Sequence, residues 1–551
     1  MKRTNILLLF ALIIIVYCCA IGVDAMDADA SQYAAMSREM KESGSYLQVY
    51  EQGKDYLDKP PFLFWISSLS MHLFGENNFG FKFPSILIAI IAIFATYRFA
   101  KLFYDQTLAI LSAIVLASCQ ALFLITNDIR TDTILMSWVI IAIWQIAEWL
   151  HSKKTIHFLF GCAAIGAGMV TKGPIALFVP VFAFGSHFIL QRKFSYLFKP
   201  VYLLGLLVIA VVLIPMSIGL LEQFDLQPEK TVNGLNNVSG LKFFYWTQSF
   251  GRITGENAWN NNAPFSFLFE NLLWGMLPWT LFFIAGLIND LVQFIRRKFV
   301  VAAHEEFITT GGFVLTYCSL AISKYQLPHY IYVVLPLIAI STAKMIYAVF
   351  WHNKFPLLKK IITPIQWFVA AVLLIAPVLL LLYSFPSKTI WPWLIPVVAF
   401  IVVLILLFYK TVTKKLFGIS LAVFIGLNLF LSLWFYPNIL QYQAGSVAGR
   451  YITEQKIERG NFFMFRVTGI GESIHFYSKQ IVSVADSIDQ LASGTYLLTM
   501  DEGLQNIKSS QKKFEIVKQG KDFHVTALTG KFLNYKTRDD QGNNYYIVKL
   551  K

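Results

Sequence analysis

The run NILLLFALIIIVYCCAIGV, residues 5–23, follows Lys2 and Arg3 and contains no charged side chain. A helix of roughly 17 to 25 apolar residues is long enough to cross the hydrocarbon core of a bilayer. Two basic residues before such a run are typical of a cytoplasmic N-terminus. A cleaved signal peptide starts in a similar way. Because many apolar runs follow, we interpret residues 5–23 as the first membrane helix.

The composition of the whole chain supports the same class of protein. Hydrophobic residues make up 56% of the 551 residues, charged residues make up 14%, and the mean hydropathy is +0.57. In lipid, only helices and closed barrels satisfy their own backbone hydrogen bonds, and the runs lack the alternation of barrel strands. The sequence predicts an α-helical polytopic membrane protein with about 13 transmembrane helices. The predicted spans are 5–23, 81–103, 107–126, 133–150, 156–170, 175–190, 200–221, 266–293, 307–323, 331–350, 362–384, 391–409 and 415–436.

The basic residues indicate how the chain is oriented. The net charge is +14, and much of the excess lies in short loops between the runs, where it favours a cytoplasmic position over nucleic-acid binding. The predicted cytoplasmic loops include 151–154, 191–193, 296–298, 354–360 and 410–415. An odd number of spans then places the C-terminus on the opposite, periplasmic side.

Two parts of the chain differ in composition. Residues 1–440 form the predicted membrane domain, with outer loops 24–80 and 222–265, and residues 441–551 are more polar. The segment 60–74 is short for a span and predicts an interfacial helix. Short apolar runs separated by turn residues predict a small extracytoplasmic α/β domain after residue 440. Its expected strands are 462–467, 474–484, 496–500, 523–528 and 545–548.

Two carboxylates, Asp27 and Asp29, follow the first span and precede a stretch of helical spacing. A carboxylate in this position can accept a proton from an attacking hydroxyl, or it can simply cap the helix. Asp58 and Lys59 start the interfacial segment. Lys59 would lie at the depth of lipid headgroups, where it could bind a phosphate or only anchor the helix.

Further ionisable side chains lie at the outer ends of other spans. The orientation rule leaves outer loops poor in basic residues, so repeated basic residues there predict an anionic partner such as a lipid-linked phosphate. The residues concerned are Arg130, Asp132, Lys172, Arg252, Lys324, His329 and Tyr330.

At these residues the chain resembles the polyprenyl-phosphate-dependent C-type (GT-C) glycosyltransferases, in particular the aminoarabinose (lipid A) transferases and protein mannosyltransferases. The matching features are Asp29 with Tyr33 and Arg38-Glu-Met40, Lys59-Pro-Pro61, Phe83-Pro84, Arg130-Thr-Asp132, Thr171-Lys172-Gly-Pro174, Arg252-Ile-Thr254, Pro264-Phe265, Leu277-Pro-Trp279 and Ser323-Lys324 with Leu327-Pro328 and Tyr330. Together they cover most of the membrane region in one order and on one face.

The resemblance implies the GT-C fold and an inverting transfer of a sugar from an undecaprenyl-phosphate carrier. Asp29 would be the catalytic base, and Lys59, Arg252, Lys324 and Tyr330 would bind the donor phosphate. The acceptor would be lipid A or another glycolipid, a glycan or a protein hydroxyl at the periplasmic face of the inner membrane. Further site candidates are Asp27, Tyr33, Tyr56, Arg38, Arg130, Asp132, Lys172 and His329.

The chain departs from the family pattern at two positions. Asp58 stands where relatives often carry Glu, at a position associated with a divalent metal in some of them, which leaves the use of a metal open. Gln32 stands where relatives often have a basic residue before the tyrosine, and Arg38 or Arg130 could compensate for it.

Two other classes of function remain as alternatives. A transporter or flippase of lipid-linked saccharides would carry ionisable residues near the middle of its spans, whereas here they lie near the outer ends. A sensor would bind its ligand through the C-terminal domain.

Overall fold

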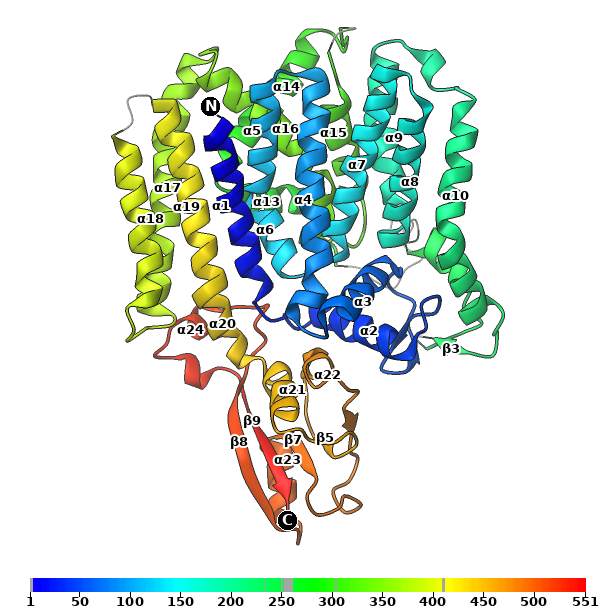
Figure 1. Cartoon of the computed structure of the whole chain (residues 1–551), viewed down its shortest axis with the longest axis vertical. Coiled ribbons are helices and arrows are strands. Elements are labelled where there is room, and N and C mark those ends of the chain that lie inside the picture. Colours follow the sequence, from blue (N-terminus) through cyan, green and yellow to red (C-terminus); the bar gives the residue numbers. More distant parts are fainter. Residues whose placement is uncertain (1–2, 233, 249–250, 252–260, 303–304, 409–411) are drawn as a thin grey trace.

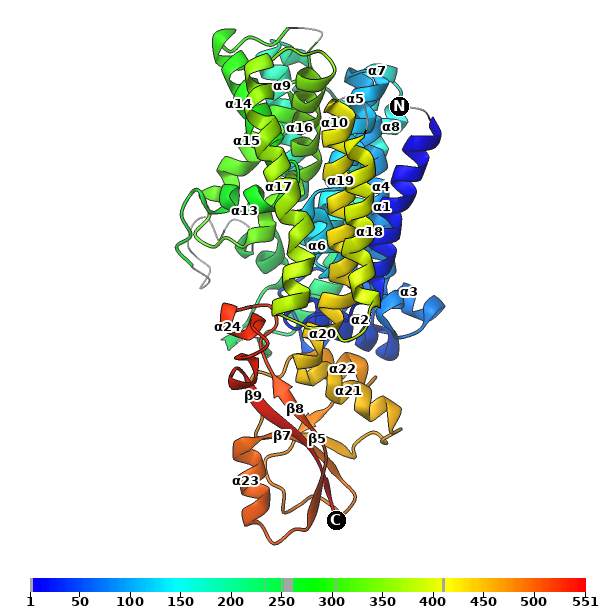
Figure 2. The ribbon, with the colours of Figure 1, turned by 90° about the vertical axis from the view of Figure 1, so that its left-hand side faces the viewer.

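Long helices run side by side in most of the molecule, and a smaller domain that contains a β-sheet lies beyond one end of them (Figures 1 and 2). The computed structural model describes residues 3–232, 234–248, 251, 261–302, 305–408 and 412–551. Helix α1 (Arg3–Ile21) begins at the end of the bundle opposite the sheet domain.

By length and composition, seven helical segments in the described ranges can cross a membrane, or eight if the bent pair α5 (Gln106–Ala117) and α6 (Gln120–Asn127) is one span. Four of the seven are the helices α4 (Asn78–Phe103), α7 (Thr131–Ser152), α8 (Thr155–Lys172) and α17 (Pro356–Tyr383). Two more are segments that contain α10 (Val201–Leu220) and α16 (Leu335–Phe350), and the last, Lys415–Tyr442, includes most of α19 (Val412–Phe430). A multi-pass membrane protein is therefore confirmed, while the number of about 13 spans is not.

The remaining predicted spans are shorter helices. Four of them correspond to α1, α9 (Ile175–Leu190), α15 (Ile308–Ala321) and α18 (Trp391–Leu407). The predicted span 266–293 is divided into α13 (Phe267–Gly275) and α14 (Thr280–Arg296), because the chain turns at 276–279.

The outer helices of the bundle present apolar side chains on their exposed faces. On α10, Leu203 and Leu207 are largely exposed, and on α17 so are Phe368 and Leu382. In water such a surface would be strongly unfavourable, so these faces are suited to contact with lipid tails.

Two short helices lie across the end of the bundle that faces the sheet domain (Figure 1). Helix α2 (Asp29–Ser43) ends at Gly44, which has a left-handed backbone (φ 70°). Helix α3 (Phe62–Phe74) follows Pro60 and Pro61, as expected since proline fits the start of a helix. It buries Leu63 and Phe64 and exposes Leu69 and Leu73. A helix in the segment 60–74 is therefore confirmed, and its amphipathic surface suits a membrane interface.

The C-terminal domain contains a five-stranded mixed sheet in the order β6-β5-β7-β9-β8. Strand β5 (Phe462–Phe465) pairs in parallel with β6 (Ser483–Val484) and β7 (Tyr496–Met500), and β9 (Asn543–Leu550) pairs antiparallel with β7 and β8 (Phe514–Asp522). The main helices of the domain are α21 (Ala444–Glu454), α22 (Ser473–Tyr477) and α23 (Asp501–Ser509), and the short helix α24 (Gly530–Leu533) lies near the bundle.

Two of the predicted strands are wrong. Most of the expected strand 474–484 is α22 and the turn after it, and the strand expected at 523–528 lies upstream, in β8. In both places apolar side chains are buried against neighbouring elements without alternating along a strand, so the local pattern did not identify the element.

Candidate functional site

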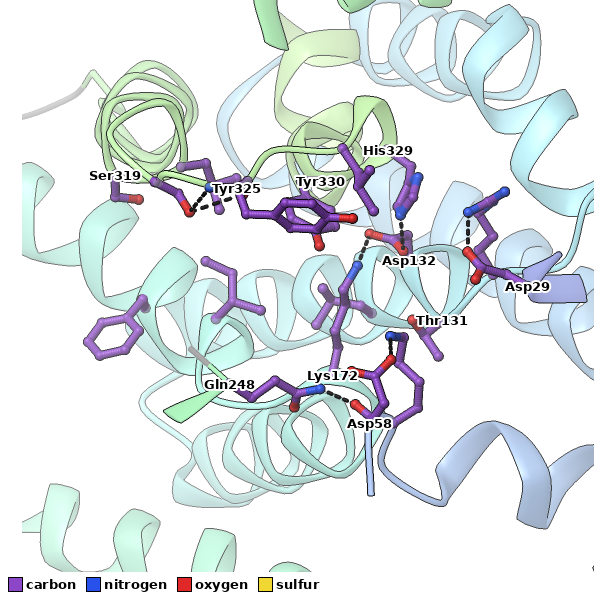
Figure 3. Close-up of a pocket in the computed structure, with 18 of the residues that line it drawn as sticks. Asp29, Asp58, Thr131, Asp132, Lys172, Gln248, Ser319, Tyr325, His329 and Tyr330 are labelled. Atoms are coloured by element: carbon purple, nitrogen blue, oxygen red, sulfur yellow. Dashed lines mark hydrogen bonds and ion pairs between the residues drawn. The ribbon is translucent and has the colours of Figure 1, made fainter. Parts of the chain in front are cut away.

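A cavity of about 360 Å³ lies where α2, α7, α8 and the segment after α15 come together. Figure 3 shows charged and aromatic side chains that converge on it from these elements. Its polar and aromatic lining consists of Asp29, Tyr33, Asp58, Lys59, Arg130, Thr131, Asp132, Lys172, Gln248, Ser319, Ser323, Tyr325, His329 and Tyr330. Its apolar lining consists of Leu135, Ile175, Phe178, Phe182, Leu320 and Leu327.

Asp29 is the first residue of α2, and its carboxylate binds the guanidinium of Arg130. Arg130 occupies the cap position before α7 and also donates to Asp128 from Nε over 2.9 Å. The Asp29 side chain is 34% exposed and that of Arg130 is 19% exposed. One arginine therefore orients a carboxylate that ligands in the cavity can still reach.

A second charged group is built around Asp132, whose side chain is only 2% exposed. Lys172, the last residue of α8, donates to Asp132 Oδ1 over 2.5 Å, and Nε2 of His329 lies 3.7 Å from Oδ2. The ammonium of Lys172 also lies 4.5 Å from the centre of the Tyr330 ring. A carboxylate this deeply buried requires a cationic partner, and Lys172 provides it.

Lys59 and Asp58 form an ion pair just before α3, and Gln248 donates to the backbone oxygen of Asp58. The ammonium of Lys59 lines the cavity together with the side chains of Arg130 and Lys172. Within the described ranges, no group of three or more His, Cys, Asp or Glu side chains could hold a metal ion. Asp58 alone does not provide the set of oxygen ligands that a divalent ion needs, and the use of a metal stays a prediction.

Several of the predicted site residues line the cavity. These are Asp29, Tyr33, Asp58, Lys59, Arg130, Asp132, Lys172, His329 and Tyr330. Tyr33 is 1% exposed, and burial together with the nearby charge of Asp29 raises the pKa of its hydroxyl well above the usual value. Tyr33 is therefore neutral at physiological pH and can act only through hydrogen bonding and packing.

Other predicted site residues lie elsewhere. Arg38 is buried and binds Glu42 over 2.6 Å, and the ring of Tyr56 packs against Phe64. Asp27 faces the C-terminal domain. Lys324 is exposed next to the lining residues Ser323 and Tyr325. Arg252 lies outside the described residues.

The cavity also contains residues that sequence reasoning did not select. Gln248 comes from the outer loop 222–265, where its amide has no motif or helical spacing that could identify it. Phe178 and Phe182 are four residues apart on α9, a spacing that any apolar helix shows. Only the packing of α9 beside α8 brings these rings to the cavity.

The comparison with protein families gives a match in the first half of the chain. Residues 58–218 match a family model described as dolichyl-phosphate-mannose-protein mannosyltransferase. The matched segment contains Asp58, Lys59, Arg130, Asp132 and Lys172, but ends before the lining residues of the later segments.

Two similar curated proteins share the name undecaprenyl phosphate-alpha-4-amino-4-deoxy-L-arabinose arabinosyl transferase. The protein from Erwinia tasmaniensis is 29% identical over 288 residues, which cover 51% of this chain and 49% of that protein. The protein from Photorhabdus laumondii is 25% identical over 384 residues, which cover 68% of this chain and 65% of that protein. The chain thus matches about half to two thirds of the length of these relatives.

The crystal structure of ArnT from Cupriavidus metallidurans bound to undecaprenyl phosphate has a similar fold. It aligns over 100% of this chain and 98% of that chain with a TM-score of 0.71, at 15% sequence identity. The same protein in the apo state aligns with a TM-score of 0.70. The similarity therefore extends over the whole architecture, including the C-terminal domain.

Proposed function

We propose that this membrane protein, whose fold is similar to that of ArnT from Cupriavidus metallidurans, is an inverting glycosyltransferase that uses a polyprenyl-phosphate sugar as its donor. The observation that carries the proposal is the position of Asp29. Its carboxylate is held by Arg130 at a cavity that has both cationic and apolar walls.

The cavity suits an amphipathic donor. Phe178, Phe182 and Leu320 offer apolar contacts for the isoprenoid part, while Lys59 and Lys172 provide positive charge for the phosphate. A free nucleotide sugar would not need the apolar wall. The names of the similar proteins support undecaprenyl phosphate as the carrier and a 4-amino-4-deoxy-arabinose-type pentose as the sugar.

In the proposed reaction, Asp29 accepts the proton of the acceptor hydroxyl as its oxygen attacks the anomeric carbon. The bond from that carbon to the phosphate oxygen breaks, and polyprenyl phosphate leaves with the bonding electrons. Cations that face the departing phosphate stabilise its growing charge. We assign this role to Lys59 and Lys172, with Tyr330 beside Lys172, and keep Arg252 and Lys324 as predicted contributors.

The acceptor is proposed to be lipid A or a related glycolipid, as the resemblance to the aminoarabinose transferases implies. A glycan or a protein hydroxyl would react with the same base. We further propose that α1 starts in the cytoplasm and that the cavity and the C-terminal domain face the periplasm of a bacterial inner membrane. A flippase is less well supported, because Arg130, Lys172 and His329 lie at the ends of helical segments.

The proposal is tested by incubating the purified protein with a panel of polyprenyl-phosphate sugars and measuring the released carrier by mass spectrometry, with lipid A or extracted membrane lipids as acceptor. Asp29→Asn should lower kcat by about 10²-fold or more, because an amide cannot accept the proton. Glu502→Gln, the same chemical change on an exposed helix of the C-terminal domain, is the matched control and should transfer normally. Full activity of Asp29→Asn would refute the assignment of the base.

A further inference from the structure

The carboxylate of Asp27, two residues before Asp29, binds the C-terminal domain. Its Oδ1 accepts a hydrogen bond from the backbone N–H of Ser473 (3.1 Å), and its Oδ2 accepts one from the Ser473 hydroxyl (3.0 Å). The buried side-chain amide of Gln443 binds the backbone of the same segment. It accepts a hydrogen bond from the N–H of Asp27 (2.7 Å) and donates one to the carbonyl oxygen of Ala25 (3.0 Å). Residues 25–27 are therefore fixed to residues far away in the sequence.

Neighbouring contacts extend this junction. The hydroxyl of Tyr477 accepts from the N–H of Ala25 over 2.8 Å and donates to Asn78 over 2.7 Å, at the start of α4. Arg450 forms an ion pair with Asp24. Gly471 lies so close that a Cβ atom there would be 2.4 Å from Cγ of Asp27. Only glycine leaves room for the carboxylate at this position.

Between the two carboxylates, Ala28 has a strained backbone conformation, with φ 101° and ψ −116°. Residues other than glycine avoid this region, and they keep it only where the surrounding contacts impose it. Here the contacts lie on both sides, since Asp27 is bound by the C-terminal domain and Asp29 is bound by Arg130. This bend turns one carboxylate away from the cavity and the next one toward it.

We infer that Asp27 is a positioning residue, through which the C-terminal domain holds Ala28 in its strained conformation and thereby aims Asp29 at the cavity. The inference rests on the proposed function for its effect on catalysis. It also gives the C-terminal domain a part in the reaction without any contact with the substrate.

Variants of Asp27 distinguish a positioning role from a role as a second catalytic base. In Asp27→Asn the amide can still accept from the Ser473 N–H and can donate to the Ser473 hydroxyl, so most activity should remain. Asp27→Ala and Gly471→Ala both break the junction and should lower kcat by about tenfold, with the donor KM changed less than about twofold. Gly530→Ala, at a glycine of the same domain with open space around it, is the control and should behave like wild type.

A second substitution at Ala28 distinguishes a positioning effect from loss of folding. It should restore activity only if Gly471→Ala acts through the backbone conformation of Ala28. Glycine adopts the conformation of Ala28 without strain, so Ala28→Gly should restore a large part of kcat in the Gly471→Ala background. If Asp27→Asn is as inactive as Asp29→Asn, or if Ala28→Gly restores nothing, the positioning role is wrong.

Hydrogen exchange tests the junction independently of turnover. Peptides that cover residues 24–40 should exchange about tenfold faster in Gly471→Ala than in Gly530→Ala, because the start of α2 is no longer held. Unchanged exchange would overturn the inference even in an active enzyme. The wild-type protein could also fail to transfer sugar from any donor while the difference in exchange is still observed. That result would refute the proposed function but would support the junction.

Discussion

At the scale of single residues, the two lysine–carboxylate pairs of the cavity differ in burial. Asp132 is 2% exposed where it binds Lys172, whereas Asp58 is 37% exposed where it binds Lys59. Removing one partner of a buried pair leaves an uncompensated charge in a medium of low dielectric constant, while an exposed carboxylate is solvated by water. Under the proposed function the two lysines have similar tasks toward the phosphate, but they contribute differently to stability.

We predict that Lys172→Met lowers the free energy of unfolding by about 3 kcal/mol, and Lys59→Met by about 1 kcal/mol or less. Thermal unfolding of the purified proteins in detergent measures the difference. The double variant Lys172→Met/Asp132→Asn should recover much of the loss, because the buried charge is removed as well. Equal destabilisation by the two single variants would contradict this explanation.

At the scale of helices, close packing of α8 determines where Lys172 lies. A Cβ atom on Gly168 would be 2.8 Å from the Cβ of Ala176 and 3.3 Å from that of Trp138, so α8 contacts α7 and α9 without space for a side chain. Lys172 is one turn further along the same helix. Small residues at such crossings are common in membrane proteins because they let helix backbones approach each other.

Gly168→Val should separate these helices, destabilise the protein by about 1 to 3 kcal/mol and weaken donor binding by displacing Lys172. Gly185→Val on α9 is the control, because no atom lies within 4 Å of the position of its Cβ. The midpoint of thermal unfolding and the donor KM measure the two effects. If Gly168→Val and Gly185→Val have the same unfolding midpoint and the same donor KM, the helix crossing does not determine the position of Lys172.

At the scale of the whole molecule, the membrane domain and the C-terminal domain meet around a second, smaller cavity. Asp27, Asp522 and His524 all line it. Burial raises the pKa of Asp522 to about 6, and the negative charge of Asp27 acts in the same direction. Burial also raises the pKa of Asp27. The junction thus brings together two carboxyl groups whose pKa values are both raised by burial.

The raised pKa of Asp522 predicts a pH dependence of stability. Between about pH 4 and pH 6, the folded protein binds more protons at this residue than the unfolded chain does, so its contribution to stability falls as the pH rises. Asp522→Asn keeps an acceptor for the N–H of Ala444 and should be more stable than wild type at pH 7, by about 1 to 2 kcal/mol. The two proteins should converge near pH 4, as measured by thermal unfolding at several pH values. If the difference in stability between Asp522→Asn and wild type does not change with pH, the pH dependence does not come from Asp522.

The sequence by itself determined the class of the protein and the order of its main elements. Long uncharged runs identify membrane helices because backbone groups in lipid must bond within their own segment, and this is a local property. The prolines before α3 predicted its start, and the motif around Asp29 and Lys59 selected side chains that do line the cavity. The number of spans was not determined, since a bent pair such as α5 and α6 reads as one apolar run.

Only the tertiary structure decided which way the side chains of these motifs face. Asp27 and Asp29 look equivalent in sequence, but they line different cavities. The backbone bends at Ala28, and Ser473 binds the first carboxylate while Arg130 binds the second. Gln248 lies in the site because a distant loop folds over Asp58. Such positions depend on contacts between residues hundreds of positions apart, and no local pattern of apolar and charged residues encodes them.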